Sequence, residues 1–163
     1  MPIPVECERR FLVTGDGWRE MARQANRIRQ GYLTNTEGVT VRVRRVGERG
    51  YLTIKTPKQG ISRAELEYEI PAEHADFLIE AACGRRMIEK VRHEITHAGL
   101  AWTVDEFHGL NQGLVLAEIE LDRADRPLVL PAWVGPEVTA TNRFHNSYLS
   151  RHPYSLWVLD GAA

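Results

Sequence analysis

The sequence predicts an α+β fold that is mainly β, in which consecutive antiparallel strands can close into a barrel with a few helices beside it. Three observations predict this class. Seven or eight segments alternate with a period of two residues. Short turns rich in glycine separate them, which is typical of strands that pair with their neighbours in the chain. Nearly every segment carries charges at alternate positions, so one face of each strand is polar.

The first of these segments, Val5–Val13, has the densest charge pattern. Glu6, Glu8 and Arg10 occupy every second position and share one face of the predicted strand. Two carboxylates on one face repel each other unless a divalent cation or cationic side chains lie between them. The alternative is the solvated outer face of an ordinary half-buried strand.

The remaining elements follow in order along one domain, 1–153, with a C-terminal tail at 154–163. Helices are predicted at Trp18–Asn26, at Pro71–Ala82 with Gly84 as its C-terminal cap, and at Arg143–Ser150. We expect the large side chains of Trp18, Trp102, Trp133 and Phe77 to pack in the core or between the barrel and its helices. Further strands are predicted at Arg27–Leu33, Val39–Val46, Tyr51–Thr56, Ile61–Ile70, Arg85–His97, Leu100–Phe107 and Leu114–Leu121.

Composition limits the classes of partner. The net charge is −1, so there is no overall basic field of the kind that binds nucleic acid. No apolar run approaches the length of a membrane span and no signal peptide is evident, so we expect a cytoplasmic protein. Cys7 and Cys83 lack metal-ligand spacing, and Cys7 is predicted to be a plain apolar thiol.

The order of the charges bears on which way the polar faces point. Acidic pairs gather on some strands and basic pairs on others, whereas a solubilising surface intersperses the two signs. If the charges face inward, the barrel is a tunnel with the components of a metal–phosphate site. Oxygen ligands for Mg²⁺ or Mn²⁺ would come from Glu6, Glu8, Glu118 and Glu120. Phosphate-binding donors would come from Arg42, Arg44, Lys55, Lys90 and Arg92. If the charges face outward, the interior is apolar.

An ordered set of motifs resembles the CYTH superfamily, the triphosphate tunnel metalloenzymes. Val5–Val13 is similar to the N-terminal E-x-E-x-K signature of this family, and the resemblance covers residues 3–150. The other motifs are Gln30-Gly31-Tyr32-Leu33, Val41-Arg42-Val43-Arg44, Leu52-Thr53-Ile54-Lys55, Ser62–Glu67, Ile88–Arg92, Val104–Phe107, Ala117–Glu120 and Glu137-Val138-Thr139.

The resemblance implies an eight-stranded antiparallel barrel that binds triphosphate in its tunnel and hydrolyses it with a divalent metal. Glu6, Glu8, Glu118 and Glu120 would be metal ligands, directly or through water. Glu65, Glu67 and Asp105 would line the acidic side, where they would bind a second metal or orient water. Tyr32 would orient substrate or water, with a packing aromatic as the alternative. Phosphate oxygens would be bound by Arg42, Arg44, Lys55, Arg63, Arg86, Lys90 and Arg92.

Two positions depart from the family pattern. Arg10 stands where the family usually has Lys, and it keeps the charge but not the compact ammonium group. Arg143 lies next to the position of a C-terminal Lys, so we expect Arg10 and Arg143 to join the substrate-binding set.

The predicted activity is hydrolysis of inorganic triphosphate, with nucleoside triphosphates as poorer substrates. Adenylyl cyclase and thiamine triphosphatase use the same tunnel chemistry and stay open as alternatives, as does a non-catalytic polyphosphate-binding or nucleotide-binding module. A homodimer is compatible with the sequence, although no residue pattern supports it.

Overall fold

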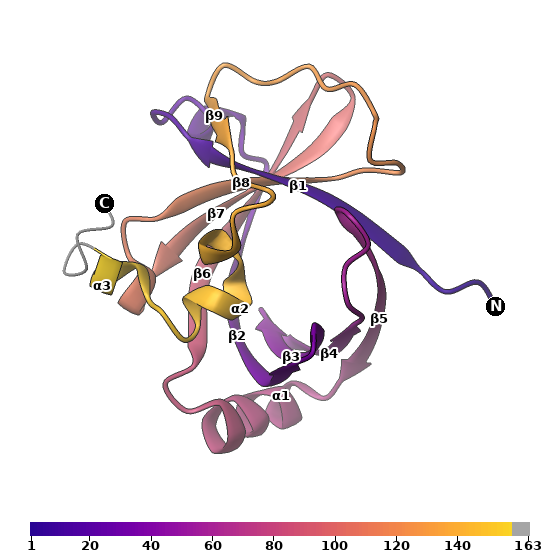
Figure 1. The fold of residues 1–163 in the computed structure, drawn as a ribbon. Helices are drawn as coiled ribbons and strands as arrows, with labels where there is room; N and C mark the ends of the chain where they lie inside the picture. The colour runs from indigo at the N-terminus through magenta and orange to yellow at the C-terminus, as the bar shows by residue number, and fades with distance from the viewer. Residues whose placement is uncertain (158–163) are drawn as a thin grey trace.

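The computed structural model describes residues 1–157, with all side chains in that range except that of residue 35. Its strands are β1 (Val5–Val13), β2 (Gln24–Thr36), β3 (Val39–Val46), β4 (Arg49–Lys55), β5 (Ser62–Ile70), β6 (Met87–His97), β7 (Leu100–His108), β8 (Val115–Glu120) and β9 (Val134–Glu137). They run antiparallel in the order β5-β4-β3-β2-β6-β7-β8-β1, and β5 pairs again with β1. The predicted eight-stranded closed barrel is confirmed (Figure 1).

The first strand closes the barrel by pairing on both sides. Its N-terminal part pairs with β5, where Glu6 lies opposite Arg63. Its C-terminal part pairs with β8, where Glu8 lies opposite Glu120 and Arg10 opposite Glu118. The ninth strand, β9, pairs with the end of β1 outside the barrel, and the sequence pattern did not predict it.

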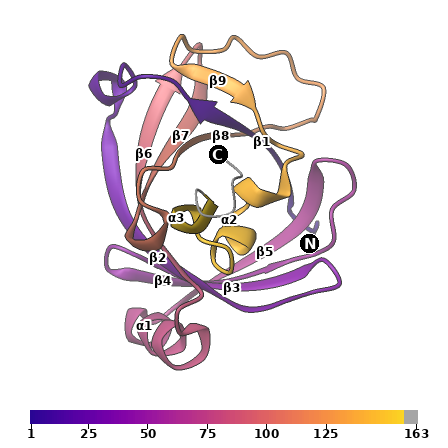
Figure 2. The ribbon, with the colours of Figure 1, turned by 60° about the vertical axis from the view of Figure 1, so that its left-hand side comes forward.

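The helices lie outside the barrel wall and at its opening. The predicted helix at 71–82 is present as α1 (Ala72–Leu78), continued by a π-helical turn over Ile79–Cys83, and Gly84 follows it with a positive φ of 56°. Figure 2 shows α1 below β3 and β4, whereas α2 (Asn146–Leu149) and α3 (Tyr154–Trp157) lie in front of the barrel opening.

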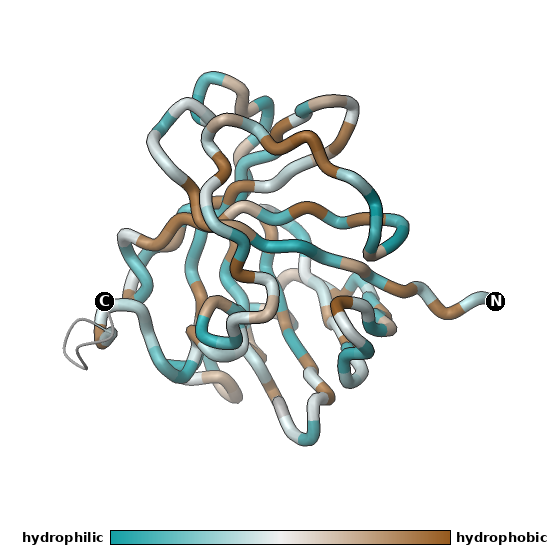
Figure 3. Tube along the Cα trace, turned by 45° about the horizontal axis from the view of Figure 1, so that its top comes forward, coloured by the Kyte–Doolittle hydropathy of each residue, from teal (hydrophilic) through white to brown (hydrophobic). Residues whose placement is uncertain are grey.

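The apolar core lies mostly around the charged interior of the barrel rather than within it. One cluster, which contains Cys7, Phe11, Trp18, Trp102 and Trp133, covers the outer face of β1, β7 and β8. A second cluster packs α1 against β3. The third fills one end of the barrel beside α2 and α3, and includes Ile88, Phe107, Leu116, Phe144 and Trp157. Along strands such as β3 and β4 hydrophilic and hydrophobic residues alternate, and the changes of colour along the tube in Figure 3 reflect two faces with opposite environments.

Two local predictions were wrong. The helix expected at Trp18–Asn26 is a single 3₁₀ turn at Arg19–Met21, because β2 begins at Gln24 and its pairing with β6 takes the following backbone groups. Phe77 is 68% exposed on α1 instead of packed in the core. Of the tail predicted at 154–163, the part that is described forms α3, and Trp157 is buried; the rest lies outside the described residues.

Within residues 1–157, no helix is long and apolar enough to cross a membrane.

Candidate active site

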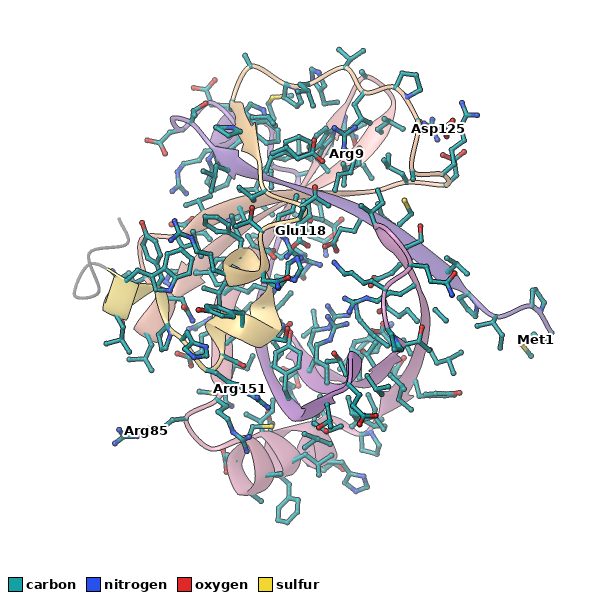
Figure 4. All side chains as sticks on the ribbon, in the orientation of Figure 1. Met1, Arg9, Arg85, Glu118, Asp125 and Arg151 are labelled. Atoms are coloured by element: carbon teal, nitrogen blue, oxygen red, sulfur yellow. The ribbon has the colours of Figure 1, made fainter. Side chains whose placement is uncertain are left out.

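A polar cavity of about 240 Å³ occupies the interior of the barrel. Figure 4 shows nitrogen and oxygen atoms gathered in the opening near Glu118, while Arg9 lies on the other side of β1. The charged side chains that line the cavity are Glu6, Glu8, Arg10, Arg42, Arg44, Lys55, Lys58, Arg63, Glu65, Glu67, Lys90, Arg92, Glu118 and Glu120. The charged faces of the strands therefore point inward, which excludes the solvated-surface alternative for these residues.

The wall formed by β1 and β8 is built around Glu118. Arg10 Nε donates to Glu118 Oε1 over 2.9 Å, and Arg92 Nη2 donates to Oε2 over 2.8 Å. Arg10 also donates from Nη2 to Glu8 Oε1 over 2.6 Å. Burial alone would raise the pKa of Glu118, but Arg10 and Arg92 hold it well below its ordinary value. Glu118 is thus ionised throughout the neutral range.

Glu6 forms a second anchor, between β1, β4 and β5. Lys55 Nζ donates to both of its carboxylate oxygens, over 2.9 and 3.0 Å, and Arg63 Nε donates over 2.6 Å. Lys55 also pairs with Glu65 over 2.9 Å. Although burial acts in the opposite direction, interaction with Glu65 and the charge of Lys55 lower the pKa of Glu6. Burial and the neighbouring Glu6 raise the pKa of Glu65.

The opposite wall belongs to β3, β4 and β5. Arg44 Nη2 donates to Glu67 Oε2 over 2.9 Å, and the hydroxyl of Thr53 donates to the same oxygen over 2.8 Å. Arg42 lies within 3.4 Å of Glu67 and 3.5 Å of Glu65. Burial and the neighbouring Arg42 lower the pKa of Arg44 to about 10, so the Arg44 guanidinium group carries a charge at neutral pH.

Asp105 lies on β7, between β6 and β8, and does not line the cavity. It is 0% exposed, and its two oxygens accept from Lys90 Nζ over 2.5 Å and from Arg92 Nε and Nη2 over 2.7 Å each. Lys90 Nζ also donates to Asn146 Oδ1 over 3.2 Å. Burial lowers the pKa of Lys90 to about 8 in spite of the nearby Asp105 carboxylate. Asp105 therefore fixes the side chains of Lys90 and Arg92, two residues of β6 that line the cavity.

Glu120 differs from the other predicted metal ligands because its side chain forms no hydrogen bond or ion pair with the described residues. Burial, together with the negative charges of Glu6 and Glu8, raises its pKa. No three Asp, Glu, His or Cys side chains of the described chain already converge into a metal site. The donor set nevertheless fits a hard divalent cation, since Glu8 and Glu120 lie opposite each other on neighbouring strands and the Glu120 carboxylate forms no ion pair with the described residues.

Two of the predicted phosphate ligands lie away from this cavity. Arg86 is exposed before β6, and its Nη2 donates to the carbonyl oxygen of Ala82 over 3.4 Å. Arg143 stacks over the rings of Phe144 and Trp157, at 5.4 and 4.6 Å from their centroids. Neither side chain is among those that line the barrel interior.

Five lining residues were not predicted as site residues. Thr40 shares the inward face of β3 with Arg42 and Arg44, so the strand alternation already contains the signal that could have found it. The others are Lys58, His145, Asn146 and Ser147. Lys58 comes from the loop after β4, and the last three from the start of α2 and the residue before it, so only the tertiary fold brings them to the barrel.

His145 gives this site a testable pH dependence. Its Nε2 lies 3.2 Å from the carbonyl oxygen of Thr139, so Nε2 carries a proton and donates. Burial and the positive charges of Arg10, Lys58 and Arg63 lower the pKa of His145 from 6.5 to about 4. Between these two values the unfolded chain binds a proton that the folded chain does not bind, so the stability of the wild type decreases as the pH decreases through this window.

We expect His145→Asn to remove this dependence. As the pH is lowered from about 7.5 to about 5, the thermal midpoint of the wild type should decrease more than that of the variant. His74→Asn is the matched control, because His74 is exposed on α1. A midpoint difference for His145→Asn that stays constant across this pH range would contradict the assignment.

The chain is similar to known proteins over most of its length. The CYTH domain family profile matches residues 5–151. The chain is 44% identical over 149 residues to the inorganic triphosphatase of Acetivibrio thermocellus, covering 91% of this chain and 95% of that protein. It is 35% identical over 149 residues to the inorganic triphosphatase of Nitrosomonas europaea, covering 89% and 96%.

A solved structure agrees with these relatives. The crystal structure of an inorganic triphosphatase superposes with a TM-score of 0.64 at 32% identity, and the match covers 89% of this chain and 93% of that one. Residues 5–151, which the family profile matches, contain all eight strands of the charged barrel. The chain therefore belongs to the CYTH domain family.

Proposed function

We propose that the protein hydrolyses inorganic triphosphate inside the barrel with a divalent metal, Mg²⁺ or Mn²⁺. One observation carries the proposal: the cavity inside the barrel, in which eight Lys and Arg side chains and six Glu side chains of the described residues form the charged lining. The cations match a polyanion, and the carboxylates match the metal that accompanies it. The family implies a divalent metal, and two relatives that are at least 35% identical are named inorganic triphosphatases.

The basic residues would bind the phosphate oxygens. Seven of these residues line the cavity, and each of them forms an ion pair with a Glu or with Asp105: Arg10, Arg42, Arg44, Lys55, Arg63, Lys90 and Arg92. Phosphate oxygens accept the same donors as carboxylates, and arginine can bind them through two nitrogens. Binding of triphosphate would exchange part of these ion pairs and release the carboxylates that Lys55, Arg63, Arg10 and Arg92 hold.

The released carboxylates Glu6, Glu8 and Glu118, together with Glu120, would hold the metal. When bound, a divalent metal neutralises phosphate charge and promotes attack by water on phosphorus. Glu65 and Glu67 lie on the β5 wall and would accept hydrogen bonds from the attacking water. Asp105 would act indirectly, by fixing Lys90 and Arg92 in the orientation that meets the substrate.

The lining favours an inorganic substrate over a nucleotide. Among the described lining residues, only Tyr32 and His145 have aromatic side chains, and Tyr32 is only 6% exposed. A nucleoside base would find little aromatic surface on which to stack. We therefore expect inorganic triphosphate to be preferred over ATP and thiamine triphosphate.

The test is phosphate release from inorganic triphosphate, ATP and thiamine triphosphate at equal concentrations of metal and substrate. The proposal predicts the highest kcat/KM for inorganic triphosphate. Formation of cyclic AMP from ATP, without phosphate release from inorganic triphosphate, would identify a cyclase instead. Tight binding of inorganic triphosphate with no turnover of any of the three would identify a binding module.

Arg44→Ala should weaken substrate binding. The variant removes one charge-assisted donor, so KM for inorganic triphosphate should rise about tenfold or more, with a smaller change in kcat. Arg45→Ala is the matched control, because Arg45 is the next residue on β3 and pairs with Asp76 on the outside of the barrel over 3.3 Å. Equal KM values for Arg44→Ala and the wild type would remove Arg44 from the phosphate-binding set.

A further inference from the structure

A buried glutamine lies directly behind the tyrosine of the cavity. Gln30 is 0% exposed on β2, and its Nε2 donates to the hydroxyl oxygen of Tyr32 over 3.2 Å. Tyr32 lines the cavity, whereas Gln30 does not. The two residues are separated by one position on the strand, so both side chains point to the interior of the barrel.

The surroundings of this pair hold polar atoms that lack partners. Gln30 Oε1 is buried without a hydrogen-bond partner among the described residues, and so is Nε of both Arg42 and Arg44. These arginines lie opposite the pair in the sheet, with Tyr32 opposite Arg42 and Gln30 opposite Arg44. Unsatisfied polar atoms on adjacent strands indicate that this part of the wall is built for hydrogen bonding rather than for packing.

A packing role alone would not explain an amide at this position. Leu or Met would fill a similar volume without the free-energy cost of a buried amide oxygen that has no partner. Ile88, which lies opposite Gln30 on β6, and Ile28, two positions before Gln30 on β2, are buried and show that apolar side chains are accommodated beside this position. The amide at residue 30 therefore has a purpose that a hydrocarbon side chain would not serve.

The hydrogen bond between the two side chains determines what Tyr32 can do. Because its hydroxyl oxygen accepts from Gln30, its own proton is free to be donated elsewhere. Burial raises the pKa of Tyr32, so the hydroxyl keeps that proton at neutral pH. Facing a cavity rich in cations, such a donor is directed at the anion that the cations hold.

We propose that Gln30 is a positioning residue, which orients the hydroxyl of Tyr32 so that it donates a hydrogen bond to an oxygen of the bound triphosphate. The inference rests on the proposed function, since it takes the anion in the barrel to be the substrate. The inference adds a neutral hydrogen-bond donor, the hydroxyl of Tyr32, to the charged donors that bind the substrate. It also assigns a role to Gln30, whose side chain does not line the cavity.

A double-mutant cycle tests this role. Gln30→Met, Tyr32→Phe and the double variant are titrated with inorganic triphosphate by calorimetry in EDTA, which requires neither metal nor turnover. If Gln30 acts through Tyr32, each single variant should weaken binding about tenfold. The double variant should then bind no more weakly than Tyr32→Phe. The thermal midpoint of each variant is measured in parallel, and Gln30→Leu replaces Gln30→Met if the latter does not fold.

Either of two results would overturn the inference: wild-type affinity in Tyr32→Phe, or losses that add in the double variant. If Gln30 had a purely structural role, its replacement would lower the thermal midpoint, but the losses of affinity in the two single variants would add in the double variant. Failure of the proposed function looks different, because the wild type would then release no phosphate from inorganic triphosphate with metal, while the binding cycle would still give its answer on Gln30.

Discussion

The Glu120→Gln variant is expected to fold normally and to lose about a hundredfold or more of the metal-dependent rate of triphosphate hydrolysis. The substitution removes a ligand charge and little volume. It breaks no hydrogen bond or ion pair among the described residues, because the side chain of Glu120 forms none there. It even relieves repulsion with Glu6 and Glu8, the two carboxylates that raise the pKa of Glu120. Stability should therefore be unchanged or slightly higher.

The measurement is phosphate release from inorganic triphosphate with saturating Mg²⁺ or Mn²⁺, together with the thermal midpoint. Glu73→Gln serves as the control, since Glu73 is an exposed residue in the first turn of α1. If Glu120→Gln keeps most of its turnover, the metal assignment on β8 is wrong. A lower midpoint would show that Glu120 has a structural partner.

Asp105→Ala is expected to cause the largest loss of stability of any single change in the site. Asp105 is the counter-ion of Lys90 and Arg92, and it forms an ion pair with both of them. Removing one member of a buried charge cluster leaves the others without compensation, which costs about 3–5 kcal/mol. In a domain of this size, such a loss corresponds to a thermal midpoint lower by roughly 10 °C.

The loss should depend on pH. The pKa of Lys90 is already lowered to about 8 by burial, and without Asp105 it should be lower still. Since an unfolded lysine titrates near 10.5, the variant should gain stability relative to the wild type as the pH rises above neutrality. Denaturant unfolding at several pH values measures both effects. The exposed Asp125→Ala is the control, and an unfolding free energy equal to that of the wild type would contradict the structural role of Asp105.

The arrangement of the barrel could be predicted from the sequence because its polar faces have a period of two. Glu6, Glu8 and Arg10 mark one face of β1 in the sequence itself, and the structure turns that face inward. Periodicity alone did not decide between inward and outward. The order of the CYTH motifs decided it, since a resemblance to a family with a known fold supplies the long-range information that local pattern lacks.

The rest depended on contacts between distant parts of the chain. His145 and Asn146 reach the cavity only because the C-terminal segment returns to the barrel opening, where Asn146 accepts from Lys90. The segment at Trp18–Asn26 has helical spacing but is drawn into β2 by pairing with β6. Arg86 shares the alternation of its strand, yet it precedes the first residue of β6 and points to solvent. The residue at which a strand begins to pair with its neighbour cannot be predicted from the local sequence.

The central claim, that a metal and a triphosphate act together in the barrel, is tested most directly by one measurement. The protein is freed of metal with EDTA, and phosphate release from inorganic triphosphate is followed while Mg²⁺ or Mn²⁺ is added back. The account predicts negligible release without metal and full recovery on its return. Release that continues undiminished in EDTA would contradict it, because the glutamates of β1 and β8 would then have no metal to bind.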